Sequence, residues 1–492
     1  MDICQLIDLL LKYGLKKGLI KEDDYYYTLN ALLDVFKLDD YVINQESKED
    51  LSLDEILSLM LDYAIKENLI ENTNECKDLF DTRIMGVLTP KPSEINHTFK
   101  KLMKKDPKEA TDYFYSLCKD TNYIRTSRIK KDIHFDYESE YGTINISINM
   151  SKPEKDPNDI KKLLTAKPSS YPKCMLCKEN VNYSGRIGFP ARQTLRSVPV
   201  TLANEDFYIQ YSPYSYYNEH LICFHKDHFN MRVNNQTFNE LVDFVRIFPH
   251  YFLGSNAGLP VVGGSILNHH HFQGGKATLP MENAKKRLIK TIGDVNVYML
   301  SWAMSVIRLE SKEYKQLLNV AYNVLDKFAN YNNKELMIIN KDEDGPHNTI
   351  TPIARVKNGV YELDLVLRNN LITSDRPLGL YHPREQYWHI KKENIGLIEV
   401  MGLAILPSRL NKEMKYVKKY LLNQPLTDNE KVDFEKHLSW ANMLKENNKI
   451  NEENVETIIN NGIGEVFTKV LKDCAVFKDE NLDEFERFIL SI

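Results

Sequence analysis

The chain has 492 residues, with 64 Lys and Arg against 69 Asp and Glu, which gives a formal net charge of −5 at pH 7. A small charge made of both signs argues against a protein that coats nucleic acid or a membrane surface. The length suffices for about two to four domains with cores that need no disulfides. We therefore expect a small-molecule partner.

The lack of a recognisable targeting signal and the pattern of cysteines lead us to expect a cytoplasmic protein. The first residues carry no basic segment followed by an apolar stretch, and no run of about 18 apolar residues occurs. The seven cysteines form an odd set in which only Cys174 and Cys177 are closely spaced. A disulfide framework is therefore not expected.

Residues 1 to about 130 are expected to be helical, because their apolar residues recur at helical spacing. The sequence Ser52-Leu53-Asp54-Glu55 is a capping-box pattern that opens one of these helices. Apolar and polar residues alternate over 144–150, which predicts a strand. Further short strands are expected at 207–211, 220–224 and 260–265, with a helix at about 237–252.

The rest of the chain repeats this mixed character. It predicts a strand at 295–299, a helix at about 311–331, a hairpin that turns at Asn358-Gly359 and helices over about 411–491. The fold class is therefore α+β, with mixed or antiparallel sheet halves packed with helices. The expected regions are 1–130, 131–290 and 291–492. The two sheet halves could be structurally related, although self-similarity in the sequence is too weak to prove a duplication.

A cluster of histidines indicates a functional site. Seven of the thirteen histidines lie between residues 220 and 271, and three of them are consecutive. In an extended segment His269, His271 and Gln273 would share one face, roughly 6–7 Å apart, while His270 and Phe272 share the other. This separation allows one metal-bound histidine beside one free histidine. A fortuitous surface tract or a set of core histidines is the alternative reading.

Cys174 and Cys177 form a CxxC pair that could hold one side of a tetrahedral zinc ion. His228 and His269 are the ligands we expect to complete the site. Such a zinc would be structural, because protein fills all four positions. A redox pair would be expected beside a βαβ unit, which the sequence does not indicate, and a chance pair remains the other alternative.

The segment 259–275 resembles the signature of the second family of galactose-1-phosphate uridylyltransferases, within the wider histidine-triad superfamily. The resemblance continues at 204–207, 217–220, 345–352 and 392–402, and it covers most of residues 170–410. It implies two histidine-triad-like halves and suggests a homodimer. Two positions differ from the family pattern: His270 stands where an acidic residue is usual, and Asn268 replaces a serine.

The resemblance implies an exchange of uridylyl groups between UDP-glucose and galactose 1-phosphate, through a uridylyl-histidine, in the Leloir pathway of galactose metabolism. The substrates would be UDP-glucose, UDP-galactose and hexose 1-phosphates. His271 would be the nucleophile, since a neutral imidazole can attack phosphorus when an acceptor holds its other nitrogen. Gln273 would donate its amide hydrogens to a non-bridging phosphate oxygen.

Four further residues are candidates for substrate binding. Gly264 and Ser265 permit close backbone approach and offer N–H and hydroxyl donors to phosphate. By similarity to the family, Asn204 and Asn256 would contact the uridine part. Either asparagine could instead be a turn residue.

Cationic residues near the motifs are candidates for binding anions. Arg186, Arg192 and Arg196 follow the CxxC pair and could clamp a diphosphate, although a solvated basic loop is the alternative. Lys392 and His347 are further candidates, for phosphate or a second metal.

Two other functions remain open at this point. One is a related nucleotidyltransferase or phosphorylase that acts on another sugar phosphate or on a dinucleoside polyphosphate. The other is a catalytically silent scaffold stabilised by zinc, which would be expected to lack His271 or Gln273; both are present.

Overall fold

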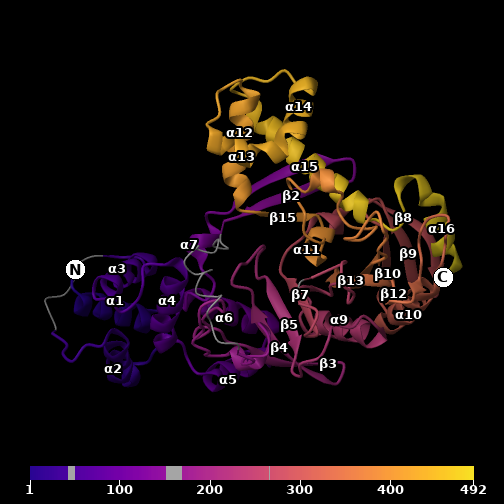
Figure 1. Ribbon diagram of the computed structural model, residues 1–492. Coiled ribbons are helices and arrows are strands. Elements are labelled where there is room, and N and C mark those ends of the chain that lie inside the picture. Colours follow the sequence, from indigo (N-terminus) through magenta and orange to yellow (C-terminus); the bar gives the residue numbers. More distant parts are fainter. Residues whose placement is uncertain (43–49, 151–168, 265) are drawn as a thin grey trace.

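The computed structural model describes residues 1–42, 50–150, 169–264 and 266–492. A helical region at the amino terminus is followed by a long antiparallel sheet, and a group of carboxy-terminal helices stands over the sheet (Figure 1). The predicted α+β class is confirmed.

The amino-terminal region is helical, as the spacing of its apolar residues predicts. Its helices are α1 (Ile3–Lys16), α2 (Tyr25–Phe36), α3 (Leu53–Lys66), α4 (Asn74–Leu88), α5 (Pro92–Met103), α6 (Pro107–Asp120) and α7 (Thr126–Ile129). The capping box at the start of α3 is formed, because the side chain of Ser52 accepts from the Glu55 N–H and the Glu55 carboxylate accepts from the Ser52 N–H. Leu10, Leu32 and Ile84 are among the fully buried residues that hold these helices together.

A ten-stranded antiparallel sheet forms the centre of the described structure. In spatial order its strands are β3 (Val198–Leu202), β4 (Glu205–Tyr211), β5 (Leu221–His225), β7 (His271–Gly275), β6 (Phe252–Gly254), β13 (Asn348–Lys357), β14 (Val360–Asn369), β10 (Val306–Ser311), β9 (Val295–Leu300) and β8 (Lys286–Ile292). The strands predicted at 207–211, 220–224 and 295–299 correspond to β4, β5 and β9.

The two halves of this sheet have the same order of elements along the chain. The first half runs β3, β4, β5, α9 (Asn235–Ile247), β6, β7, and the second runs β8, β9, β10, α10 (Tyr314–Asn330), β13, β14. In space the orders are also equivalent, with β6 and β13 paired at the centre. The short strands β11 (Lys341–Asp342) and β12 (Gly345–Pro346) are an insertion before β13. The topology thus contains the repeat that the sequence left open.

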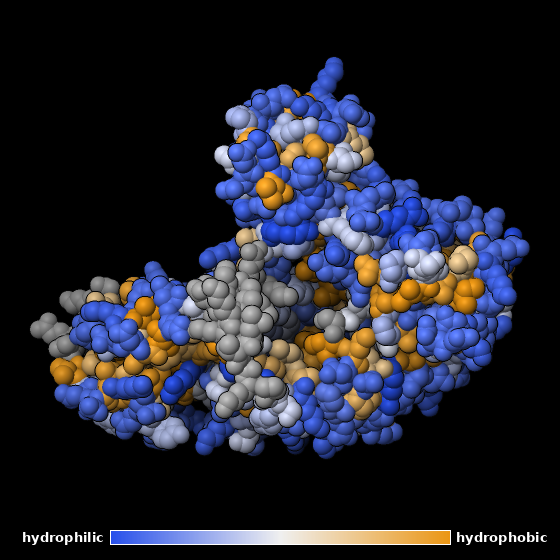
Figure 2. All heavy atoms as spheres, viewed as in Figure 1, coloured by the Kyte–Doolittle hydropathy of each residue, from blue (hydrophilic) through white to orange (hydrophobic). Residues whose placement is uncertain are grey.

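The two faces of the sheet are covered differently. Helices α9 and α10 lie on one face (Figure 1), where one hydrophobic core continues from the sheet into the amino-terminal helices. A second core lies on the opposite face and joins the second half to the carboxy-terminal elements. Figure 2 shows the molecule hollowed between those elements and the sheet. In the first half, the face opposite α9 is therefore available for a functional site.

The carboxy-terminal elements build a smaller unit around a three-stranded sheet. In this sheet β2 (Gly142–Asn149) lies between β1 (Ile133–Ser139) and the parallel strand β15 (Leu403–Pro407). Its helices are α11 (Leu397–Val400), α12 (Arg409–Leu421), α13 (Asp428–Phe434), α14 (Leu438–Asn447) and α15 (Val455–Cys474). The last helix, α16 (Leu482–Ser491), packs instead against β8 and β9 of the ten-stranded sheet. The strand at 144–150 and the late helices were predicted. No helix among the described residues is both long and apolar enough to cross a membrane.

Local chemistry explains where other predictions held and failed. The hairpin at Asn358-Gly359 is confirmed, with φ of 51° and 76° as a primed turn requires. The strand predicted at 260–265 is wrong: its described residues form turns, and Val261 has φ of 72°, a left-handed conformation outside the extended range of strands. The helix predicted to reach residue 252 ends at Ile247, just before Phe248 and Pro249.

A buried ionic network links the strands of the second half. Asp364 on β14 is fully buried and accepts hydrogen bonds from Arg308 Nε at 2.6 Å and from Arg355 Nη2 at 2.6 Å. Burial alone would raise the pKa of Asp364, but the two guanidinium groups hold it below its ordinary value. The carboxylate is therefore ionised and pairs with two buried cations.

We predict that Asp364→Ala lowers the free energy of unfolding by about 3–5 kcal/mol, because it leaves the buried Arg308 without its carboxylate partner and Arg355 with only Glu362 and Glu282. The matched control is Glu486→Ala, which breaks the exposed pair with Arg287 and should cost less than about 1 kcal/mol. Thermal or urea denaturation measures both. Equal losses in the two variants would contradict the assignment.

Candidate functional site

The predicted site lies on β7, in the middle of the first half of the sheet. His271 is the first residue of this strand and pairs with Phe224 on β5, and Gln273 pairs with Ile222. Phe272 faces the core beneath α9. Because side chains alternate along a strand, His271 and Gln273 lie on the opposite, more open face.

His269 lies in a cluster of four potential metal ligands. Its Nε2 donates to the carbonyl oxygen of His225 at 2.8 Å, so its Nδ1 faces the cysteines. That Nδ1 lies 3.2 Å from the Sγ of Cys174 and 3.7 Å from the Sγ of Cys177. The Nδ1 of His228 lies 3.1 Å from the Sγ of Cys177.

These four residues fit a tetrahedral metal ion. Their ligand atoms lie within 4.8 Å of one another, and three of the four residues are well shielded from solvent. Zinc bonds of about 2.0–2.3 Å place neighbouring ligand atoms about 3.3–3.8 Å apart, which is close to the separations found. No other group of three or more such residues occurs among the described residues. The predicted ligands thus come together from three separate loops.

The hydrogen bonding of His271 leaves one of its ring nitrogens without a hydrogen. Its Nδ1 donates to the carbonyl oxygen of His269 at 2.8 Å, which leaves the lone pair on Nε2. Burial lowers the pKa of His271 to about 4, so the imidazole is neutral at physiological pH. The Nε2 makes no hydrogen bond to the described residues. The backbone acceptor expected for the second nitrogen is therefore present.

Gln273 lies beside a histidine that the sequence reasoning did not assign. His220 immediately precedes β5, and its Nε2 lies 3.2 Å from the Oε1 of Gln273. His220 belongs to the histidine-rich region and to the resembling segment 217–220, which was the only signal that could have marked it. The pairing of β5 with β7 brings it to the site.

His270 points away from this face, as the alternation predicts. It is fully buried, stacks on Phe229 with ring centroids 5.3 Å apart, and its Nε2 lies 3.0 Å from the Oε2 of Glu240 on α9. Glu240 also accepts from Arg232. His270, which differs from the family pattern, is therefore part of the packing between β7 and α9.

The glycine pair before the histidines packs closely against Asn256. A Cβ on Gly264 would lie 2.6 Å from the Nδ2 of Asn256, and Gly263 has φ of 145° with Ala257 O close behind it. The Oδ1 of Asn256 accepts from the N–H of Leu397 at 2.8 Å. Close backbone approach is thus present here, while the ligand contacts of Gly264 and Asn256 stay predictions. Ser265 lies outside the described residues.

Asn204 has the features of a turn residue. It is exposed at the tip of the β3–β4 hairpin, with φ of 69° after Ala203 with φ of 48°. This conformation explains an asparagine at this position without any ligand. Its contact with uridine stays a prediction.

The three arginines after the CxxC pair have different roles. Arg196 is buried and donates to four carbonyl oxygens, including Pro90 O at 2.7 Å and Thr89 O at 3.1 Å, so it cannot take part in an anion clamp. Arg186 donates to the hydroxyl of Tyr183 at 2.8 Å. Arg192 keeps a buried Nε without a partner in the described structure. Anion binding by Arg186 and Arg192 stays a prediction.

The remaining cationic candidates lie in the second half. Lys392 is exposed, and its Nζ lies 4.8 Å from the ring centroid of Trp388. Its neighbour Lys391 is instead buried and bonded to Glu399. The Nδ1 of His347 contacts the side-chain oxygen of Asn370, and no metal-like cluster forms around it in the described structure. Phosphate binding by Lys392 stays a prediction.

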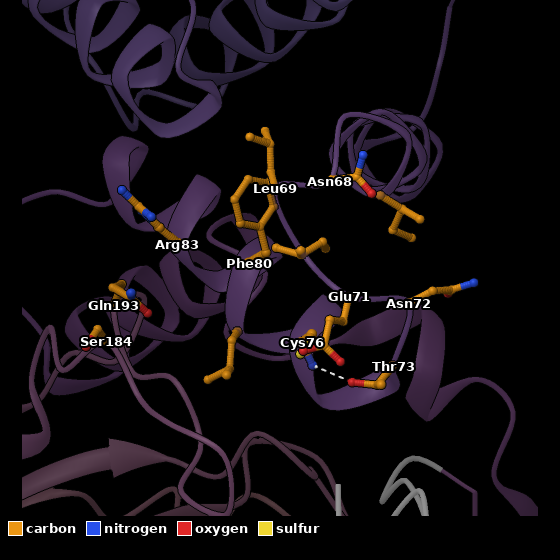
Figure 3. Close-up of a pocket in the computed structure, with 13 residues that line it drawn as sticks. Asn68, Leu69, Glu71, Asn72, Thr73, Cys76, Phe80, Arg83, Ser184 and Gln193 are labelled. Atoms are coloured by element: carbon orange, nitrogen blue, oxygen red, sulfur yellow. Dashed lines mark hydrogen bonds between the residues drawn. The ribbon is translucent and has the colours of Figure 1, made fainter. Parts of the chain in front are cut away.

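A large cavity lies elsewhere in the molecule. It has a volume of about 1250 Å³ and opens between α3, α4 and the loop that contains Ser184 and Gln193. Figure 3 shows Leu69, Phe80 and Arg83 around it. None of the predicted site residues lines it, so volume alone does not mark the histidine site.

In a comparison with known protein families, most of the chain matches two domains. Residues 19–230 match the galactose-1-phosphate uridyl transferase N-terminal domain, and residues 242–442 match the C-terminal domain of the same family. The predicted site residues from 174 to 228 fall in the first match, and His269, His271 and Gln273 fall in the second.

Similar proteins extend over nearly the whole length. The galactose-1-phosphate uridylyltransferase of Clostridium acetobutylicum is 47% identical over 489 residues, which covers 98% of each chain. That of Bacillus subtilis is 41% identical, with 99% of this chain and 98% of the relative covered. A solved structure, yeast Ap4A phosphorylase, is 12% identical with a TM-score of 0.34, over 60% of this chain and 90% of that one. This last similarity is weak, and nothing about the chain is inferred from it.

We predict that Arg196→Ala lowers the free energy of unfolding by about 2–4 kcal/mol, because it leaves several buried carbonyl oxygens without a donor. Arg186→Ala is the matched control, since its contacts are partly exposed and its loss should cost less than about 1 kcal/mol. Denaturation of the two variants makes the comparison. If Arg186→Ala were the more damaging change, the structural role of Arg196 would be refuted.

Proposed function

The chain belongs to the galactose-1-phosphate uridyl transferase family, and on that premise we propose that it exchanges UMP between UDP-glucose and galactose 1-phosphate through a covalent intermediate on His271. One observation carries this proposal. The Nδ1 of His271 donates to a backbone carbonyl, so the lone pair of a neutral imidazole is on Nε2. That is the atom an attack on phosphorus requires.

The reaction proceeds in two displacements. His271 Nε2 forms a bond to the α-phosphorus of UDP-glucose, and the bond to the leaving oxygen breaks to release glucose 1-phosphate. A phosphate oxygen of galactose 1-phosphate then attacks the same phosphorus, which releases the imidazole and gives UDP-galactose. The first step releases a sugar phosphate, which is a stable anion, and the second releases the neutral imidazole of His271, so neither step needs a general acid.

Gln273 supports this chemistry from the same face of β7. Its amide can donate to a non-bridging oxygen as negative charge develops on the transferring group. The Gly263-Gly264 turn permits a phosphate to approach the backbone closely. We further propose that Arg186, Arg192 and Lys392 contribute positive charge, and that Asn204 and Asn256 contact uridine.

We propose that Cys174, Cys177, His228 and His269 hold one structural zinc ion. The ligand types, their separations and their closed arrangement favour zinc without an open coordination position. The ion supplies rigidity. His269 is then fixed at both ring nitrogens, and its carbonyl orients His271.

The other expectations follow from this activity. A catalytically silent scaffold is not supported, because the nucleophile and its amide partner are both present on one face. We propose a cytoplasmic enzyme, since a reducing compartment keeps Cys174 and Cys177 available as metal ligands, and all described cysteines are free. We also propose a homodimer with the regions 1–130, 131–290 and 291–492, which light scattering and limited proteolysis can examine.

We predict that His271→Ala abolishes uridylyl transfer while secondary structure and metal content persist. With uridine-labelled UDP-glucose and no acceptor, the wild type should acquire acid-labile, base-stable label on His271, because phosphorus bonded to imidazole has that stability. The variant should acquire none. The control is His134→Ala on the exposed strand β1, which should label normally. Full turnover by His271→Ala would exclude the covalent mechanism.

For the metal, we predict about one zinc per chain and a lower thermal midpoint in Cys174→Ser, with a smaller effect on turnover per folded molecule. The matched control is Cys76→Ser, which changes a thiol outside the cluster and should leave zinc content and midpoint unchanged. Elemental analysis and calorimetry provide the measurements. A metal-free wild type of full stability would contradict the zinc site.

A further inference from the structure

We propose that His220 is a positioning residue that fixes the Gln273 amide with its hydrogens toward the transferring phosphoryl group. The inference rests on the proposed function, because it assigns a supporting partner to Gln273 in that reaction. The observation that carries it is the contact between His220 Nε2 and Gln273 Oε1 at 3.2 Å.

The surroundings of His220 hold its imidazole ring in place. It is 3% exposed and lies between two aromatic rings, with centroids 5.4 Å from Tyr216 and 4.6 Å from Tyr217. Its carbonyl oxygen accepts from the N–H of Ser212 at 2.8 Å, which continues the β4–β5 ladder. The ring therefore cannot swing away from Gln273 without a rearrangement of the strand end.

The backbone around His220 is tied directly to the end of β7. The hydroxyl of Tyr217 donates to Gly274 O at 3.1 Å, and Glu219 adopts φ of 54° with its carboxylate bonded to the hydroxyl of Tyr251. A Cβ on Gly275 would lie 2.7 Å from Glu219 O, so this approach requires glycine. The segment 217–220 and the end of β7, which carries Gln273, are thus held rigidly together.

The hydrogen on His220 is determined by its burial. Burial lowers the pKa of His220 to about 4, so the neutral ring carries a single N–H. Its Nδ1 is buried and has no partner in the described structure. A hydrogen there would be an unpaired buried donor, which is costly, so the hydrogen is on Nε2 and donates to Gln273 Oε1.

This arrangement decides what Gln273 presents to the substrate. Its oxygen is occupied by His220, and so its two N–H groups are the end left for the open face. A flipped amide would place a carbonyl oxygen against the negatively charged phosphate and would also lose the bond to His220. His220 thereby excludes the unproductive orientation before substrate binds, which is preorganisation of a transition-state donor.

The test is a double-mutant cycle on His220 and Gln273. The rate of the first displacement in each variant is measured by rapid-quench labelling with UDP-glucose. His220→Phe keeps an aromatic ring between the two tyrosines but removes the donor. We expect its rate of label transfer to fall about 10- to 100-fold, with KM for UDP-glucose nearly unchanged, because the amide acts mainly in the transition state. In a Gln273→Ala background the same substitution should change the rate less than about twofold.

His250→Phe is the matched control, because His250 lies in the same half of the sheet but bonds to Thr111. It should leave the labelling rate unchanged. An equal loss from His220→Phe in both backgrounds, or no loss in either, would overturn the inference. A wild type that neither exchanges nor acquires label would instead refute the proposed function, so the two failures are distinguishable.

If His220→Phe does not fold, His220→Asn replaces it in the cycle. This residue keeps an amide donor, so we expect part of the rate to be retained, with the remaining loss again absent in the Gln273→Ala background. Folding is monitored by circular dichroism and by metal content. A loss by His220→Asn that persists without Gln273 would show a merely structural role and end the proposal.

Discussion

The arrangement of the site depends on His269, which is engaged through three of its groups. Its Nδ1 faces the cysteines, its Nε2 donates to the carbonyl of His225, and its own carbonyl accepts from the Nδ1 of His271. The side chain thus locks the backbone whose oxygen selects the tautomer of the neighbouring imidazole. The backbone of His269 therefore determines which nitrogen of His271 carries the lone pair.

The repeated sheet presents different side chains on the same face of its two halves. Both halves have the same strand order, and α9 and α10 lie on the same face of the sheet. In the second half the opposite face is filled by buried arginines around Asp364 and covered by the carboxy-terminal elements. In the first half that face carries His271 and Gln273 instead. One topology therefore holds an ionic network in one half and the proposed site residues in the other.

The support beneath β7 shows how a departure from the family pattern can be accommodated. His270 faces α9, where Glu240 supplies the acidic partner and Phe229 the stacking surface. Because neighbouring side chains on an extended segment point to opposite faces, a change at this position leaves the reactive face unaltered. The polar residues on the two faces of the strand thus have different surroundings: His270 is packed against α9, and His271 and Gln273, the proposed site residues, lie on the other face.

The sequence by itself determined the features that depend on local spacing. These are the helical amino-terminal region, the hairpin at Asn358-Gly359, the alternation along β7 and the four potential metal ligands. Its failures have two causes. The turn at 260–264 is set by positive φ angles that apolar composition does not reveal. The roles of Arg196 and His220 were decided by partners about 50 to 100 residues away, which only strand pairing and helix packing bring into contact. Local periods predict elements and faces, whereas the partner of a buried polar group is a property of the tertiary structure.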